Sequence, residues 1–170
     1  MSARVAHAIV SDCLRIRPDD VVTVNTWPHT SELSDAILEE CYKIGADAMA
    51  ILDTDRSFYS QLEMLSEENL RTTSKHCLGM AEYTTVNIFI GGPSNPLRMR
   101  KIPPEKFAAL FEGEKAHTDK SREKKIRGAY LAQGMVTPER ARTYGFNFQR
   151  WKRMMDSATA VRYDDMSILG

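Results

Sequence analysis

The sequence has few cysteines, no excess of charge of either sign and no long hydrophobic run. Its three cysteines, Cys13, Cys41 and Cys77, lie far apart and form no CxxC pair, which predicts a reduced, intracellular protein rather than a disulfide scaffold or a cysteine-based zinc site. Lys and Arg together number 23, as do Asp and Glu, and this balance argues against a broad charged surface for nucleic acid or anionic lipid. No stretch approaches the ~18 consecutive apolar residues of a membrane-spanning helix. We therefore expect a cytoplasmic protein that binds neither nucleic acid nor membrane.

The sequence also lacks the short motifs that identify many enzymes. It contains no Walker loop, no GxSxG nucleophile elbow and no HExxH zinc motif. No two of its histidines stand at metal-ligand spacing; they are His7, His29, His76 and His117. On these grounds we assign no catalytic residue, no metal ligand and no cofactor to this chain.

What the sequence does contain is a clear strand, loop, helix and strand between Val21 and Asp53. The first strand is rich in β-branched residues, and Thr30 or Ser31 can cap the helix that follows. Gly45 is placed to end this helix in a left-handed conformation, and residues 47–52 supply the second strand. Two apolar strands joined by a helix favour parallel pairing. The fold predicted is α/β, an open and mainly parallel sheet with flanking helices, in Rossmann-like layers without a glycine-rich nucleotide loop.

Apolar spacing and turn residues predict the remaining elements. They are helices around 3–16 and 67–79, a strand at 86–90, a helix opened by Pro103-Pro104 with a face of Phe107, Leu110 and Phe111, a fourth strand over 128–136, and a short helix that Thr137 starts and Gly145 ends. The charged stretch from 114 to 127, including Arg127, is expected to continue the Pro104 helix as a solvated face. The stripe of Trp151, Met154 and Met155 on the last helix is interpreted as core, or alternatively as a face that docks against another domain or subunit.

Two groups of polar residues follow predicted strands and could carry chemistry. Trp27 and His29 lie in the loop after the first strand, at the edge where open α/β sheets bind ligands. His29 could serve as an acid, a base or a hydrogen-bond donor, or it could be a surface histidine beside a Trp27 that packs over the sheet edge. Asp53-Thr54-Asp55 follows the second strand and resembles the DxDx motif of haloacid-dehalogenase phosphatases. In that alternative Asp53 would attack phosphorus, Asp55 would protonate the leaving group and Mg²⁺ would bind between them; otherwise these residues cap or turn the chain.

The order of elements resembles the N-terminal half of the metallo-aminopeptidases of the aminopeptidase T and aminopeptidase S type. The residues that carry the resemblance are the strand Val21–Thr26, the helix end at 39–46 and the strand after it, Asn95-Pro96 after the third strand, Thr137–Ala141 before the short helix, and the helix that contains Trp151. These motifs are individually unspecific, and together they span nearly the whole chain.

The resemblance implies a supporting role for this chain. In that family two metal ions are held by carboxylate, histidine and tyrosine side chains of the C-terminal half, so a divalent metal (zinc, cobalt or iron) is expected only there. Residues 1–170 would then form a single α/β domain, the N-terminal half of a larger metalloenzyme, with no metal site of its own. Its implied partners are the C-terminal catalytic domain or a partner subunit, with a homodimer as a further expectation. Trp27, His29 and Asn95 are the candidates for contact with substrate.

Two other interpretations share this fold. One is a domain of an iron-dependent dioxygenase that cleaves hydroxypyridine rings, whose metal ligands likewise lie in a C-terminal half. The other is a free-standing binding or assembly module that kept the fold and lost the catalytic half. Residues 164–170 resemble a cut point, and a reading frame that continues past Gly170 would favour an enzyme over a module.

Overall fold

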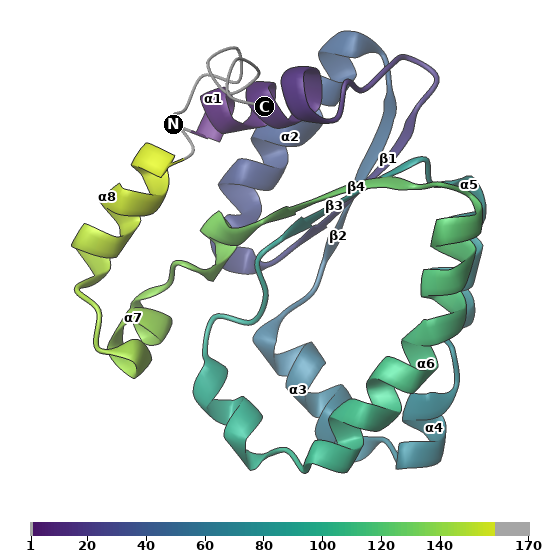
Figure 1. Ribbon diagram of the computed structural model, residues 1–170, viewed down its shortest axis with the longest axis vertical. Coiled ribbons are helices and arrows are strands. Elements are labelled where there is room, and N and C mark those ends of the chain that lie inside the picture. The colour runs from purple at the N-terminus through teal and green to yellow at the C-terminus, as the bar shows by residue number, and fades with distance from the viewer. Residues whose placement is uncertain (1, 159–170) are drawn as a thin grey trace, which may run out of the picture.

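The computed structural model describes residues 2–158, which form a sheet of four parallel strands with helices on both faces (Figure 1). The strand order is β2-β1-β3-β4. The strands are β1 (Val21–Thr26), β2 (Asp47–Leu52), β3 (Val86–Ile90) and β4 (Arg127–Leu131). This architecture confirms the predicted open, parallel α/β fold.

The first crossover follows the sequence prediction except at its start. β1 leads through a 3₁₀ turn (Pro28–Thr30) into α2 (Ser31–Ile44), and Gly45 ends α2 with φ of 88°. Thr30 does not cap α2: its hydroxyl accepts a hydrogen bond from the backbone N–H of Trp27 at 3.0 Å. The Ser31 hydroxyl donates instead to the carbonyl of Pro28. The 3₁₀ turn therefore uses the side chains that were expected to cap the helix.

One face of the sheet carries the main hydrophobic core. It is covered by α1 (Ser2–His7), the π-helix Ala8–Cys13 and α2, which lie together on one side of the sheet in Figure 1. The sheet residues of this core are Val22, Val24, Val86, Ile88, Ile90 and Leu131, all at most 4% exposed. Burial of these branched side chains stabilises the fold.

The opposite side of the sheet is covered by a helical layer with a separate core. Its helices are α3 (Asp55–Met64), α4 (Glu67–Arg71), α5 (Lys75–Tyr83) and α6 (Pro104–Glu123), with a 3₁₀ segment at Pro96–Lys101. Their shared core contains Tyr59, Leu62, Leu70, Ile102 and Ala109. Gly113 allows α6 to approach α4, because a Cβ added there would lie 2.1 Å from the carbonyl oxygen of Leu70. This layer is thus held together by its own contacts.

Several predicted elements of the helical layer are corrected by the structure. The helix expected at 67–79 is two helices, because Ser74 accepts a hydrogen bond from the backbone of Cys77 and starts α5 anew. α3 was not predicted; Thr54 caps it by accepting from the N–H of Ser57. On α6 the predicted face is confirmed for Phe107 and Leu110, which pack partly buried against this core. The side chain of Phe111, in contrast, is 66% exposed, whereas Ala109 and Gly113 are buried. Small residues occupy that face because the close approach to α4 leaves no room for large ones.

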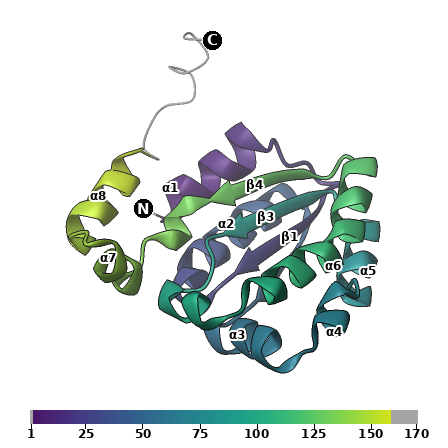
Figure 2. The ribbon, with the colours of Figure 1, turned by 60° about the horizontal axis from the view of Figure 1, so that its bottom comes forward.

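The C-terminal part also differs from expectation. α6 ends at Glu123, β4 occupies 127–131 rather than 128–136, and a 3₁₀ turn (Ala132–Met135) follows it. α7 (Pro138–Tyr144) is capped by Thr137 and ended by Gly145 as predicted. α8 (Phe148–Ala158) buries none of its residues, so the assignment of its apolar stripe to the core is wrong. Both helices lie beyond the carboxyl end of β4 (Figure 2).

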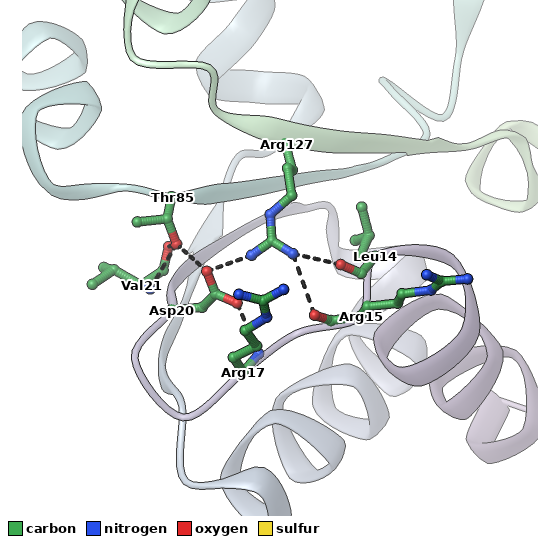
Figure 3. Close-up of polar contacts among 7 residues, drawn as sticks. All are labelled: Leu14, Arg15, Arg17, Asp20, Val21, Thr85 and Arg127. Atoms are coloured by element: carbon green, nitrogen blue, oxygen red, sulfur yellow. Dashed lines mark hydrogen bonds and ion pairs between the residues drawn. The ribbon is translucent and has the colours of Figure 1, made fainter.

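The amino edge of the sheet is held by a polar network around Asp20, which is 7% exposed (Figure 3). Its carboxylate accepts hydrogen bonds from the hydroxyl of Thr85 at 2.7 Å, from the backbone N–H of Arg17 at 2.8 Å, and from Arg127. Arg127 also donates to the carbonyl of Leu14 at 2.6 Å. Arg127 therefore belongs to β4 and to this network, not to the solvated helix face that the sequence predicted. No helix within residues 2–158 is long and apolar enough to cross a membrane.

Candidate functional site

The sheet face opposite the main hydrophobic core carries both polar and aromatic side chains. Side chains of successive strand residues point to opposite faces, so the residues between the core positions of β1 and β3 form this face. They are Thr23 and Asn25 on β1 and Asn87 and Phe89 on β3, with Tyr130 next to them on β4. In the strand register Thr23 lies opposite Asn87, and Phe89 lies opposite both Asn25 and Tyr130.

A cavity of about 830 Å³ separates this face from the helices α5 and α6. Thr23, Asn25, Asn87 and Phe89 line it on the sheet side, and Cys77, Glu114 and His117 line it on the helix side. A volume of this order is in the range of pockets that enclose small organic ligands, about 300–1,000 Å³.

The polar groups on the floor of the cavity are only partly paired. Asn25 donates from Nδ2 to Oδ1 of Asn87 at 2.6 Å, and the hydroxyls of Thr23 and Thr84 lie 3.0 Å apart. Within the part of the chain that the structure describes, Oδ1 of Asn25 and Nδ2 of Asn87 make no further hydrogen bond. The asparagine pair, which lines the cavity, thus keeps a free acceptor on Asn25 and free N–H donors on Asn87.

The charged lining of the cavity consists of Asp53, Glu114 and Arg127, with His117 beside them. Glu114 forms no ion pair with any described residue. Glu114 is an exposed residue; partial burial of its carboxyl raises its pKa, and the charge of His117 offsets the rise in part. Arg127 lines the cavity too, but its guanidinium is turned to Asp20 and the carbonyl of Leu14. Asp53 is the second acidic residue of the lining.

Of the three residues predicted to contact substrate, Trp27 lies in the cavity wall. It is 9% exposed and packs edge-on against Phe58, with ring centroids 5.9 Å apart. Both side chains line the cavity near the carboxyl end of β1, together with Asp53. The structure therefore places Trp27 at the border between the cavity and the carboxyl edge of the sheet.

His29 lies outside this cavity, at a crevice that the chain itself fills. Its Nε2 donates to the carbonyl of Gly134 at 2.9 Å, because a carbonyl can only accept. Gly134 in turn packs on Gly91 so closely that a Cβ on Gly91 would lie 2.5 Å from the carbonyl carbon of Gly134. Between β1 and β3, where open sheets of this kind bind nucleotides, the 3₁₀ turn after β4 occupies the space. His29 also lines a smaller hollow of about 270 Å³ beside α8.

Asn95 belongs to a hydrogen-bonded loop after β3. Its side-chain oxygen accepts from the backbone N–H of Leu97 at 3.0 Å, and its carbonyl accepts from the hydroxyl of Tyr59 at 2.6 Å. Asp55 holds the same loop: its carboxylate accepts from the N–H and hydroxyl of Ser94 at 2.8 and 2.9 Å and from the N–H of Asn95 at 3.1 Å. The Asp55 oxygens are therefore committed to the loop and not free to protonate a leaving group.

A buried arginine completes this loop from the other side. Arg140 of α7 is 4% exposed and donates twice to the carbonyl of Pro93, at 3.2 and 2.8 Å. Thr137 donates to the carbonyl of Ser94 at 2.8 Å.

Asp53, in contrast to Asp55, accepts only from the adjacent N–H of Thr54 among the described residues. The Asp53-Thr54-Asp55 segment thus acts as a turn, a helix cap and a loop clamp.

The structure does not assemble the sequence-predicted site residues in one place. Trp27 lines the cavity, His29 fixes the turn after β4, and Asn95 lines neither hollow. Asn25, Asn87 and Glu114 were not singled out from the sequence. A signal existed for the first two, since polar residues alternate with Val and Ile in Val22–Asn25 and Val86–Ile88. Among residues 2–158 no group of three or more His, Cys, Asp or Glu side chains is arranged to hold a metal ion.

Comparison with known proteins places this arrangement among known folds. The sequence model of a family described as "Thermophilic metalloprotease (M29)" matches residues 2–164. The solved structure described as "Wild-type AmpT from Thermus thermophilus" is similar with a TM-score of 0.65 and 16% sequence identity, over 85% of this chain and 41% of that one. No curated protein matches significantly. The chain thus spans about two-fifths of the length of the AmpT structure, and at this identity the likeness shows the fold.

Proposed function

Because the chain belongs to the thermophilic metalloprotease family M29, we propose that it is the α/β supporting domain of an aminopeptidase-like metalloenzyme. The proposal rests on two coverages taken together: how much of this chain the family match covers, and how much of AmpT this chain covers. The family match covers residues 2–164, nearly the whole chain, whereas the same chain covers 41% of AmpT. A chain that belongs to the family over almost its full length but spans less than half of a similar structure is suited to be one half of such an enzyme.

The chemistry of the available side chains supports this division. A metalloprotease needs a metal held by several His, Asp or Glu side chains that converge on one point. The described residues do not fit such a metal, since no three of these side chains are so arranged. We therefore assign the metal ligands to a C-terminal half that follows in the same reading frame, or to a partner subunit, and we route no catalytic step through this chain.

In this proposal the described domain is a structural support and contributes no reacting group. The core of α1, α2 and the sheet fixes the strands, and the loops at the carboxyl edge are fixed by Asp55 and Arg140. Of the three candidate substrate contacts, Trp27 is the best placed, because it borders the cavity. His29 and Asn95 remain candidates at the rim of the carboxyl edge, where the hydrogen bonds that they make hold them in position.

The experiment is a metal and activity measurement on the purified 170-residue chain. We expect no stoichiometric zinc or cobalt by elemental analysis and no release of amino acids from short peptides. A longer chain, expressed from a reading frame that continues past Gly170, is the matched control and should bind metal and show aminopeptidase activity. One tightly bound metal per 170-residue chain would overturn the proposal. A natural stop after Gly170, with no partner subunit that restores activity, would replace it with the free-standing module.

A further inference from the structure

We infer that α7 and α8 carry the surface on which the C-terminal half of the proposed enzyme docks. This α7–α8 surface consists of Tyr144, Phe146, Trp151 and Met154, and it fits an apolar patch that is bordered by Asp or Glu side chains. The inference rests on the proposed supporting role and deepens it, because it assigns the contact between the two halves to particular residues.

α8 is an amphipathic helix that the described part of the chain leaves uncovered. Phe148, Trp151 and Met155 recur at helical spacing, yet none of its 11 residues is buried. A helix of this length is marginal in water on its own, and helices of globular proteins are stabilised chiefly by packing of an apolar face. On the inner side, Met155 lines a hollow of about 270 Å³ together with Val5 and Leu33. α8 therefore lacks tight packing, and a further surface has to supply it.

The aromatic side chains of the α7–α8 surface are held in a fixed arrangement. The ring of Phe146 lies 6.1 Å from that of Tyr144 and 5.3 Å from that of Trp151, measured between centroids. Even so, Tyr144 is 51% exposed and Phe146 is 54% exposed. The turn between the helices is ordered, since the N–H of Phe146 donates to the carbonyl of Ala141 at 2.8 Å and the side chain of Asn147 accepts a backbone N–H of α8 at 2.9 Å. Exposed aromatic residues that are already ordered are typical of binding hot spots.

The charges around this surface indicate the chemistry of the partner. Arg150 and Arg153 are exposed and form no ion pair with any residue in 2–158. Lys152 differs, because it pairs with Asp156 at 2.9 Å. Carboxylates on the partner would complement the two arginines. A second copy of this chain fits less well, since a two-fold contact would bring the same arginines of both copies together.

The position of α8 in the chain favours the C-terminal half as the partner. α8 is the last described element, and it lies at the margin of the molecule (Figure 1). This chain covers 41% of AmpT, so a similar enzyme has room for a second half larger than this domain. In the proposed enzyme that half follows α8 in the same chain. A tether of this kind raises its effective concentration at the α7–α8 surface to the order of mM.

Hydrogen exchange of the backbone amides of residues 148–158 tests the inference. We compare the 170-residue chain with a longer chain expressed from a reading frame that continues past Gly170. Protection of α8 should be about ten-fold higher in the longer chain, because docking suppresses local opening of the helix. Equal exchange of α8 in the two chains, or a natural stop after Gly170, would overturn the inference.

The metal content of the longer chain reports on the supporting role separately. A longer chain that binds metal but leaves α8 unprotected would overturn only the docking surface. A longer chain that protects α8 but binds no metal would overturn only the metalloenzyme.

Two matched variants locate the contact. Met154 is 61% exposed on α8, and Met64 is 80% exposed on α3. In the longer chain, Met154→Asp should return the exchange of α8 to the rate of the 170-residue chain, whereas Met64→Asp should leave it unchanged. In the 170-residue chain neither variant should shift the melting temperature. Unchanged protection of α8 in the longer Met154→Asp chain would contradict the inference, and the comparison of the two wild-type chains decides the matter even if a variant folds poorly.

Sedimentation of the 170-residue chain tests the second copy as an alternative occupant. We expect a monomer, because Arg150 and Arg153 disfavour contact between two copies of the same surface. A dimer that Met154→Asp dissociates would assign the α7–α8 surface to a second copy and overturn the inference.

Discussion

The two faces of the sheet are built from the same strands and differ in almost every other respect. On the face covered by α1 and α2, Val24 and Ile88 are fully buried. Their chain neighbours Asn25 and Phe89 lie on the opposite face and line the cavity. The main hydrophobic core packs against one face of the strands. The other face is then free to carry polar and exposed aromatic side chains that would be costly in a core.

The largest expected effect separates the two faces at adjacent positions. Replacing Ile88 by Ala should lower the free energy of unfolding by about 2–5 kcal/mol, because it leaves a void in a closed core. Phe89→Ala, one residue further on, should cost less than about 1 kcal/mol, since the ring is 44% exposed. Urea unfolding of both variants measures the difference. Equal losses would show that the cavity face is as tightly packed as the core.

The next effect contrasts the carboxyl edge with the cavity that it borders. Asp55→Ala should lower the free energy of unfolding by about 1–3 kcal/mol, because the N–H and hydroxyl of Ser94 and the N–H of Asn95 lose their acceptor. Asp53→Ala is the matched control. It removes a single hydrogen bond to the adjacent N–H of Thr54 and should cost less than about 1 kcal/mol. A larger loss for Asp53 than for Asp55 would contradict the clamp described for this edge.

The smallest effect concerns the amino edge and depends on pH. Burial raises the pKa of Asp20, but hydrogen bonds from Arg127, Thr85 and the backbone of Arg17 outweigh it and hold the pKa below its ordinary value. A carboxyl whose pKa is lower when folded stabilises the protein above its ordinary pKa, and this contribution is lost as the pH falls through that value towards the folded pKa.

Asp20→Asn should therefore cost about 1 kcal/mol at neutral pH, and the difference from wild type should shrink on acidification to about pH 3. Denaturant unfolding across this range is the measurement. The exposed neighbour Asp19 provides the control, because Asp19→Asn should leave the pH dependence as it is in wild type. A constant difference between Asp20→Asn and wild type at every pH would show that the ionised form of Asp20 contributes nothing.

The strands and the family could be predicted from the sequence because their signals are local. Val21–Thr26, Asp47–Leu52 and Val86–Ile90 are short apolar runs bounded by turn residues, and the parallel pairing of β1 and β2 follows from the helix between them. The order of these elements also indicated the family, and the match over residues 2–164 confirms it. Gly45 and Gly145 end their helices as predicted, with φ of 88° and 70°.

The helical layer and the site could not be predicted because they depend on contacts between distant residues. The face of α6 is set by its approach to Leu70, which selects Ala109 and Gly113 over Phe111. The role of His29 depends on a carbonyl 105 residues away. Asn25 and Asn87 looked like polar interruptions of two strands, and only the strand order makes them a pair. Glu114 stands in a charge-rich stretch of the sequence, and only the packing of α6 over the sheet places it in the lining of the cavity.

The strand order has a consequence for how the chain assembles as it is synthesised. β1 lies inside the sheet, with β2 on one side and β3 on the other. After β2 has paired, the second edge of β1 keeps its backbone groups unpaired until residues 86–90 leave the ribosome, and β3 then waits for residues 127–131. An open strand edge is a template for pairing with another chain. The interval between these segments is therefore the period in which a nascent chain of this protein is most exposed to aggregation.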